Sequence, residues 1–158
     1  MPELPEVETV RLGLERHFLG RTISSVELRR SDLRFPFPGN FETSLIGRVV
    51  ESVERRAKYL LIRLDGGMTW LCHLGMSGRW TLIGDGVVGR PGRFSSGAPL
   101  GSGDGPHDWV VIHLDSGTKA VYSDHRRFGF MDCFPTSQQE KNKLLSNLGP
   151  EPTPDQLV

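Results

Sequence analysis

Short runs rich in β-branched and aromatic residues follow one another along most of the chain. Eight such runs are separated by turn-forming residues and span 22–28, 48–53, 59–64, 68–74, 79–83, 109–114, 119–123 and 128–134. Two of the connections, Asp65-Gly66-Gly67 and Asp115-Ser116-Gly117, are typical of β-hairpins. Many short strands joined by tight turns favour a sandwich or a barrel. We therefore predict a mainly β fold, an antiparallel β-sandwich of about eight strands.

Two helices are expected beside these strands. Apolar residues recur at three- and four-residue steps near the N-terminus, at Leu4, Val7, Val10, Leu14 and Phe18. This spacing predicts an amphipathic N-terminal α-helix. Pro5 suits its first turn and Gly20 its end. A second helix is expected near the C-terminus, over 137–147, with Gly149 just beyond it.

Two segments lack any strand or helix pattern. Between Gly84 and His107, eight of 24 residues are glycine and three are proline, which predicts a long loop inserted without a packed element. The ending GPEPTPDQLV carries three prolines and resembles a linker. We therefore expect one domain over 1–149 and the start of an interdomain linker over 150–158.

Composition and the terminal sequence argue against a membrane-spanning protein, a secreted protein and a fold held by cysteines. The 158 residues carry 19 basic and 19 acidic side chains, so the net charge of zero gives no indication of a nucleic-acid partner. No apolar run approaches the roughly 20 residues of a membrane span, and the N-terminus has no secretory signal pattern. Cys72 and Cys133 lie far apart without a CxxC pair, which argues against a disulfide framework or a cysteine zinc site. A cytoplasmic location is the resulting expectation.

The extreme N-terminus can act as a chemical reagent. Removal of Met1 would leave Pro2 with a free secondary amine, and α-amines have a pKa of about 7.7–8.0 against about 10.4 for lysine. Such an amine can attack a sugar aldehyde carbon and form an iminium ion, with Glu3 as proton donor. If Met1 is retained, the Pro2 nitrogen is an amide and cannot react. The alternative is that PELPE only starts a helix, with Glu6 and Glu8 complementing the helix dipole.

Four motifs occur in a specific order along the chain. They are PELPEVETV at the N-terminus, RRAKYLL at 55–61, HLGMSG at 73–78 and YSDHRRFG at 122–129, and LGPEP follows at 148–152. Together they resemble formamidopyrimidine-DNA glycosylase, a bacterial repair enzyme for oxidised purines. The resemblance covers only the N-terminal domain of that family, without its helix two-turn helix and zinc-finger domains.

The resemblance implies a set of catalytic residues. Pro2 corresponds to the nucleophile that attacks C1′ of the damaged nucleotide, and Glu3 to the acid. Glu6 corresponds to an acidic position near the site. Lys58 corresponds to a lysine that contacts phosphate and deoxyribose, although a lysine in an apolar run is otherwise usually a surface residue. The implied reaction removes the base and cleaves the strand by β- and δ-elimination.

The resemblance also implies DNA contacts. His73 and Arg127 correspond to phosphate contacts, although His73 alone would suit a structural role. Met76, Arg126 and Phe128 correspond to the residues that fill the gap left by an extruded base. Cytosine offers acceptors that the Arg126 guanidinium can satisfy, whereas adenine presents a donor, which predicts a preference for lesions opposite cytosine. The expected partner is double-stranded DNA with oxidised purines or abasic sites, bound by a monomer near the bacterial nucleoid.

Other interpretations stay open. Endonuclease VIII, a relative that prefers oxidised pyrimidines, has the same fold, but it normally has glycine at the position of Leu4. The 158-residue chain can also be a non-catalytic fragment or DNA-interaction module, because Lys58, His73 and Arg127 supply fewer phosphate contacts than a strong binder makes. No cofactor is expected in this chain, and zinc only in the missing C-terminal domain. His125 stands where the family often has proline.

Overall fold

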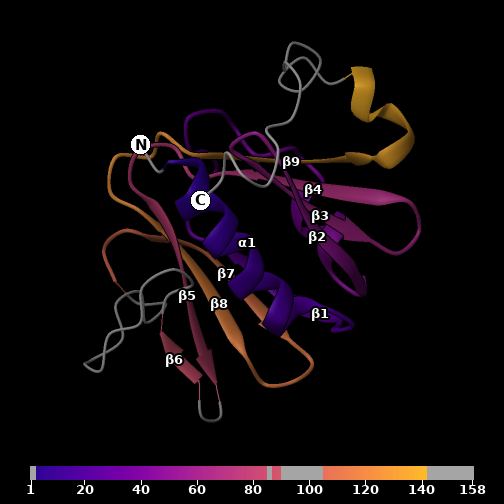
Figure 1. Cartoon of the computed structure of the whole chain (residues 1–158), viewed down its shortest axis with the longest axis horizontal. Coiled ribbons are helices and arrows are strands. Elements are labelled where there is room, and N and C mark those ends of the chain that lie inside the picture. The colour runs from indigo at the N-terminus through magenta and orange to yellow at the C-terminus, as the bar shows by residue number, and fades with distance from the viewer. Residues whose placement is uncertain (1–2, 85–86, 90–104, 142–158) are drawn as a thin grey trace.

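The computed structural model of the chain describes residues 3–84, 87–89 and 105–141. Two antiparallel sheets form the molecule, with strand orders β2-β3-β4-β9 and β1-β7-β8-β5-β6. Figure 1 shows helix α1 crossing the front of the molecule between the two sheets. The elements are α1 (Leu4–Phe18), β1 (Ile23–Leu28), α2 (Phe41–Leu45), β2 (Val50–Arg56), β3 (Tyr59–Leu64), β4 (Met68–His73), β5 (Gly78–Gly84), β6 (Val87–Gly89), β7 (Asp108–Leu114), β8 (Lys119–Asp124), β9 (Phe130–Pro135) and a 3-10 helix (Thr136–Lys141).

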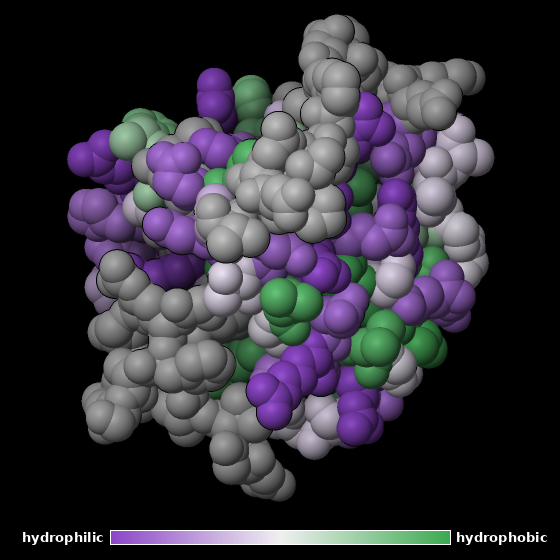
Figure 2. All heavy atoms as spheres, viewed as in Figure 1, coloured by the Kyte–Doolittle hydropathy of each residue, from purple (hydrophilic) through white to green (hydrophobic). Residues whose placement is uncertain are grey.

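This architecture confirms the predicted mainly β sandwich with an N-terminal helix. Each of the eight predicted strands is present, with ends that differ by up to three residues. Helix α1 has the predicted bounds and buries Val7, Leu14 and Phe18. Its outer face is largely hydrophilic, with separate hydrophobic spots (Figure 2). No helix in the described ranges has the length and apolar character needed to cross a membrane.

One local expectation needs correction, and two others reach beyond the described residues. The stretch 84–107 is expected to contain no packed element, and this is wrong for β6, which pairs with β5. Main-chain pairing at a sheet edge does not depend on a side-chain pattern, so the surrounding glycines did not reveal it. The predicted second helix over 137–147 is confirmed in its described part, which is a short 3-10 helix that ends at Lys141. Residues 85–86, 90–104 and 142–158, including the predicted domain end and linker, lie outside the description.

Helix α2 was not predicted from the sequence. Its five residues are too few to show a helical period. Phe41 and Leu45 are four residues apart and both are buried, so packing against the core determines this helix. The segment 29–40 before it leads the chain past the edge of β9, where the Arg34 backbone N–H donates to the carbonyl of Gly129.

The main core lies between the two sheets and beneath α1. Trp70 on β4 and Trp80 on β5 are fully buried, and their rings lie edge to face with 5.7 Å between centroids. Phe18 at the end of α1 contacts both rings. Three elements from different parts of the chain therefore meet at one aromatic cluster, which sets how α1 lies on the sheets.

The central strands β3 and β4 of the sheet β2-β3-β4-β9 are buried on both faces. Leu60 and Ile62 on β3 belong to the main core, whereas Leu61 between them joins Leu71 in a second cluster on the opposite face. Phe130 and Phe134 from β9 complete that cluster. Burial on both faces explains why β3 and β4 read as continuous apolar runs, because alternation with polar residues occurs only where one face meets water.

Candidate functional site

Two loops at one end of the sheets carry exposed apolar and cationic side chains. The β4–β5 loop bears Met76, with 49% of its surface exposed, and the β8–β9 loop bears Phe128, with 45% exposed. Arg126 is also exposed in the β8–β9 loop. The structure therefore brings the three predicted void-filling residues onto two neighbouring loops, although 50 residues of sequence separate Met76 from Arg126. Large apolar groups left in solvent are candidates for contact with a partner.

Glycines allow the two loops to lie backbone against backbone. Gly75 has φ +62°, and a Cβ there would lie 2.5 Å from the backbone carbon of Phe128 and the nitrogen of Gly129. A Cβ at Gly129 would collide with the hydroxyl of Tyr122 and lie 2.6 Å from the carbonyl oxygen of His73. At these positions even an alanine would force the loops apart.

A fully buried carboxylate connects the loops. Asp124, at the end of β8, has no exposed surface. Its Oδ1 accepts hydrogen bonds from the Ser77 hydroxyl at 2.6 Å and the Arg127 backbone N–H at 2.9 Å. Its Oδ2 accepts from the Tyr122 hydroxyl at 3.0 Å and the Gly129 N–H at 2.9 Å. The Ser77 hydroxyl oxygen in turn accepts from the Arg126 N–H at 3.0 Å.

Arg127 adopts an unusual backbone conformation between the two exposed residues of its loop. Its φ is +57°, in the left-handed region that side chains rarely adopt. The hydrogen bond from its N–H to Asp124 holds it there. Arg127 itself is half-buried, whereas Arg126 and Phe128 on either side of it are exposed. The strained residue Arg127 thus lies in a turn that exposes the side chains of Arg126 and Phe128 to solvent.

His73 ends β4 beneath these loops and is 8% exposed. Burial, together with the positive charges of Arg34 and Lys58, lowers its pKa to about 4. Its Nδ1 accepts the Gly75 N–H at 3.0 Å, so the neutral ring carries its proton on Nε2. At neutral pH the group can donate a hydrogen bond from Nε2 but brings no positive charge.

Lys58 lies at the tip of a hairpin. The pairing of Arg56 with Tyr59 leaves Ala57 and Lys58 as the turn between β2 and β3, and Ala57 takes φ +51°. The Arg55 guanidinium donates to the Ala57 carbonyl at 2.8 Å. Since the charge of Lys58 also acts on His73, these two predicted site residues lie close to one another.

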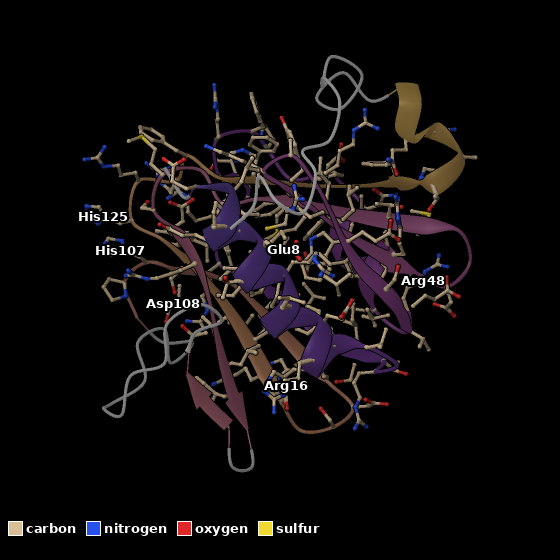
Figure 3. All side chains as sticks on the ribbon, in the orientation of Figure 1. Glu8, Arg16, Arg48, His107, Asp108 and His125 are labelled. Carbon is tan, nitrogen blue, oxygen red and sulfur yellow. The ribbon has the colours of Figure 1, made fainter. Side chains whose placement is uncertain are left out.

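An ion pair ties this hairpin to α1. Arg55, whose side chain is 6% exposed, donates to the Glu8 carboxylate at 3.1 Å, and Arg11 donates to the same carboxylate at 2.7 Å. Figure 3 shows Glu8 on the side of α1 that faces the sheet of β2 and β3. The position of Lys58 is therefore coupled through Arg55 and Glu8 to the helix that begins at the N-terminus.

The remaining predicted residues lie at the start of α1. Glu3 is the N-cap and Glu6 lies in the first turn, and both are exposed. Pro2 lies outside the described residues. Within the described part of the chain, no hydrogen bond or ion pair joins Glu3 or Glu6 to Lys58. Neither cysteine offers an alternative nucleophile, since burial raises the pKa of Cys72 to about 12 and that of Cys133 to about 11.

His125 occupies the first position of the β8–β9 loop. Its Nδ1 lies 3.3 Å from Nε2 of His107, and the two rings stand edge to face at one side of the molecule (Figure 3). Among the described residues, no group of three or more His, Cys, Asp or Glu side chains could hold a metal ion. The pair adjoins the loop of Arg126 and Phe128 without contacting those side chains through any hydrogen bond in the described ranges.

Sequence reasoning assigned no role to Ser77, Asp124 and Arg55, which organise the loops and the hairpin. It gave Glu8 only the alternative role of complementing the helix dipole. All four stand inside the four motifs: Glu8 in PELPEVETV, Arg55 in RRAKYLL, Ser77 in HLGMSG and Asp124 in YSDHRRFG. A polar residue at the end of an apolar strand, just before an arginine-rich turn, was the signal that could have identified Asp124.

Comparison with known sequences identifies close relatives. A family described as "Formamidopyrimidine-DNA glycosylase N-terminal domain" matches residues 1–131. Curated proteins named formamidopyrimidine-DNA glycosylase are similar to the chain, at 53% identity for that of Azorhizobium caulinodans and 48% for that of Ruegeria pomeroyi. Each alignment covers 96% of this chain and 51% of the relative. The chain thus spans about half the length of these relatives.

Solved structures with the same fold contain DNA. A complex of the Lactococcus lactis protein with abasic-site DNA has a TM-score of 0.76 and 28% identity, and it covers 98% of this chain and 52% of that one. A second L. lactis complex, with DNA that contains N7-benzyl-Fapy-dG, has a TM-score of 0.75 and 29% identity, with coverage of 98% and 51%. The family and the fold agree with the motifs in the sequence.

Proposed function

The chain belongs to the formamidopyrimidine-DNA glycosylase family, and we propose that it supplies the catalytic residues of a DNA base-excision repair enzyme. The substrates are formamidopyrimidines and 8-oxoguanine in double-stranded DNA, and the enzyme is also an abasic-site lyase. For formamidopyrimidines and abasic-site DNA, this proposal extends to the chain what its relatives are named for and what their structures are described as binding. The 8-oxoguanine substrate and the lyase activity rest on the resemblance of the four motifs. The observation that carries it is the pair of loops, joined through Asp124, that present Met76, Arg126 and Phe128 to solvent.

Pro2 is the proposed nucleophile. Its nitrogen lone pair forms a bond to C1′ of the damaged nucleotide while the glycosidic electrons leave with the base, which takes up a proton. Ring opening, with proton transfer by Glu3, gives an iminium ion between Pro2 and C1′. Loss of a C2′ proton to a base then expels the 3′ phosphate, and a second elimination expels the 5′ phosphate. Release requires water to hydrolyse the iminium.

Lys58, Arg127 and His73 are the proposed phosphate contacts. Lys58 stands at a half-buried hairpin tip close to the buried His73, so a phosphate between the hairpin and the loops could meet both. Because the pKa of His73 is about 4, its contribution is a neutral N–H donor. Glu6 in the first turn of α1 is proposed to lie near the sugar.

Met76, Arg126 and Phe128 are the proposed void-filling residues. Removing a base from the stack costs a few kcal/mol, and side chains that occupy the vacated space recover part of it. The Arg126 guanidinium offers only donors, which suits the acceptors of an unpaired cytosine and not the N6 donor of adenine. The presence of Met76, Arg126 and Phe128 favours the oxidised-purine enzyme over an endonuclease VIII-like pyrimidine enzyme.

The activity of the 158-residue chain by itself is a separate question. Lys58, His73 and Arg127 are about three phosphate contacts, against the six to ten of a strong DNA binder. We therefore propose weak, salt-sensitive DNA binding and little base excision by this chain, in a bacterial cytoplasm near the nucleoid. No cofactor is proposed for these residues. Zinc would bind in a C-terminal domain, which would lie in the part of the relatives that this chain does not cover.

Borohydride trapping tests the proposal. The chain is incubated with abasic-site duplex at low salt, and borohydride reduces any iminium to a stable cross-link. A chain that keeps an N-terminal tag is the matched control, because its Pro2 nitrogen is an amide. We expect an adduct whose mass and tryptic map place DNA on Pro2, and none with the tag. If intact mass shows that Met1 is removed and no adduct forms, the chain acts as a non-catalytic DNA-interaction module.

A further inference from the structure

Asp124 is a buried side chain that hydrogen-bonds to both exposed loops, and Ser77 joins the same loops through its hydroxyl. The four hydrogen-bond donors to Asp124 come from the β4–β5 loop, from β8 and from the β8–β9 loop. Being fully buried, Asp124 cannot itself contact DNA. No salt bridge in the described ranges joins it to Arg126 or Arg127, so neutral donors satisfy this carboxylate.

A carboxylate matches this position chemically, because its two oxygens accept two hydrogen bonds each. Hydrogen bonds to a charged group are stronger than those between neutral groups. Asparagine has the same shape but replaces one oxygen with an NH2 group, which is a donor. Whichever way the amide turns, the N–H of Arg127 or of Gly129 would then face a donor and lose its partner.

From this geometry we propose that Asp124 is a positioning residue, which holds the loop of Met76 and the loop of Arg126 and Phe128 as one rigid unit that enters the duplex together. The inference rests on the proposed function, since it concerns how the void-filling residues act. Two loops that are ordered before DNA arrives do not lose conformational entropy at the moment of binding. Discrimination of an abasic site from normal DNA should therefore depend on Asp124, although it lies outside the interface.

A second buried aspartate gives a matched control. Asp108 on β7 is 3% exposed and accepts the Ser123 hydroxyl at 2.5 Å and the Gly105 N–H at 2.9 Å. Neither of these donors belongs to the β4–β5 or β8–β9 loop. Asp108→Asn thus replaces a buried carboxylate of the same sheet with an amide. It leaves the contacts between the β4–β5 and β8–β9 loops in place.

The experiment measures binding of the chain at low salt to duplexes that carry a tetrahydrofuran abasic analogue or normal bases. Asp124→Asn should lower the preference for the abasic duplex by about tenfold, the effect of losing one charge-assisted hydrogen bond. Asp108→Asn should retain the preference, even where both variants lose thermal stability. Amide exchange at Arg127 and Gly129 should accelerate in Asp124→Asn only.

Ser77 supplies a test that does not disturb the buried charge. Ser77→Ala removes the bridge between Asp124 and the Arg126 N–H, and it should reduce the preference for abasic DNA, whereas Ser77→Thr keeps the hydroxyl and should restore it. If Asp124→Asn fails to fold, this pair of variants decides the question.

The outcomes separate the two proposals. An unmodified chain that binds abasic and normal duplexes equally would overturn the proposed function and this inference with it. A chain that discriminates, and whose Ser77→Ala and folded Asp124→Asn variants discriminate equally well, would overturn only the positioning role of Asp124.

Discussion

The imidazole of His73 lies parallel to the ring of Phe130, with 5.0 Å between centroids and 2° between planes. Tyr59 meets the same imidazole edge-on at 4.9 Å. This aromatic surrounding removes water from the ring, which is why a histidine at the edge of an exposed site stays neutral. The β3–β4–β9 sheet thus sets the charge of a predicted DNA contact.

The first prediction concerns stability against pH. The pKa of His73 is about 4 in the folded chain and 6.5 when unperturbed, so the unfolded state binds more protons between these values. The free energy of unfolding should therefore be fully retained above pH 6.5 and fall by at most about 3 kcal/mol as the pH drops to 4. His73→Gln, which can still accept the Gly75 N–H, should flatten this part of the curve. Urea unfolding at several pH values measures it, and parallel curves for both chains would contradict the assignment.

A second prediction compares two glycines with similar backbone conformation. Gly75 and Gly67 have φ +62° and +74°, but only at Gly75 would a Cβ meet other atoms. Gly67→Ala should cost about 1–2 kcal/mol for the left-handed conformation alone. Gly75→Ala should cost about 1–3 kcal/mol more, because the β8–β9 loop must move away. Equal losses in urea unfolding would show that the two loops do not pack closely.

A third prediction tests the connection between α1 and the β2–β3 hairpin. Glu8→Gln removes the carboxylate shared by Arg55 and Arg11, leaving the buried Arg55 with weaker partners. We expect a loss of about 1–2 kcal/mol in the free energy of unfolding. The Arg11 and Arg55 hydrogen bonds lower the pKa of Glu8, so the loss should be complete above pH 4.5 and shrink in more acidic solution. Glu27→Gln, at an exposed pair with His113, is the control and should change stability by less than about 0.5 kcal/mol.

The fourth prediction separates DNA binding from stability. Met76→Ala and Phe128→Ala remove exposed side chains, so each should change the free energy of unfolding by less than about 0.5 kcal/mol. Both should weaken binding to abasic duplex by roughly tenfold, since an aromatic or apolar contact with a base contributes about 1–3 kcal/mol. Leu12→Ala, on α1 with similar exposure, should leave both quantities unchanged. Retained affinity in both loop variants would argue against their insertion into DNA.

The fifth prediction concerns the base opposite the lesion. A complete enzyme can be assembled by joining this chain to the second half of its Azorhizobium caulinodans relative, which is 53% identical over the shared part. Arg126→Ala in that chimera should reduce the preference for excision opposite cytosine over adenine, while Arg79→Ala, at an exposed site on β5, should not. Single-turnover excision of 8-oxoguanine from the two duplexes gives the ratio. An unchanged ratio would assign the preference to another residue.

Local patterns predicted α1 and the eight strands because each element carries its apolar residues along its own length. This holds even for β1 and β9, whose partners β7 and β4 lie far away in the sequence. The N-terminal apolar period and the Asp-Gly-Gly turn are examples of such local patterns, since their residues act within a few positions of one another. Strand β6 and helix α2 were missed for the opposite reason. A three-residue strand and a five-residue helix contain too few residues to show a period, and they form because neighbouring elements hold them.

The sequence by itself determined the kind of fold and, through its four motifs, the family to which the chain belongs. Only the tertiary structure decided how the site is held together. It buries His73 between aromatic rings so that the imidazole stays neutral. It also brings Ser77 to Asp124 and Glu8 to Arg55, each pair more than forty residues apart. The physical reason is that burial and hydrogen bonding depend on which groups meet in space, and these groups meet only when the sheets and α1 are assembled.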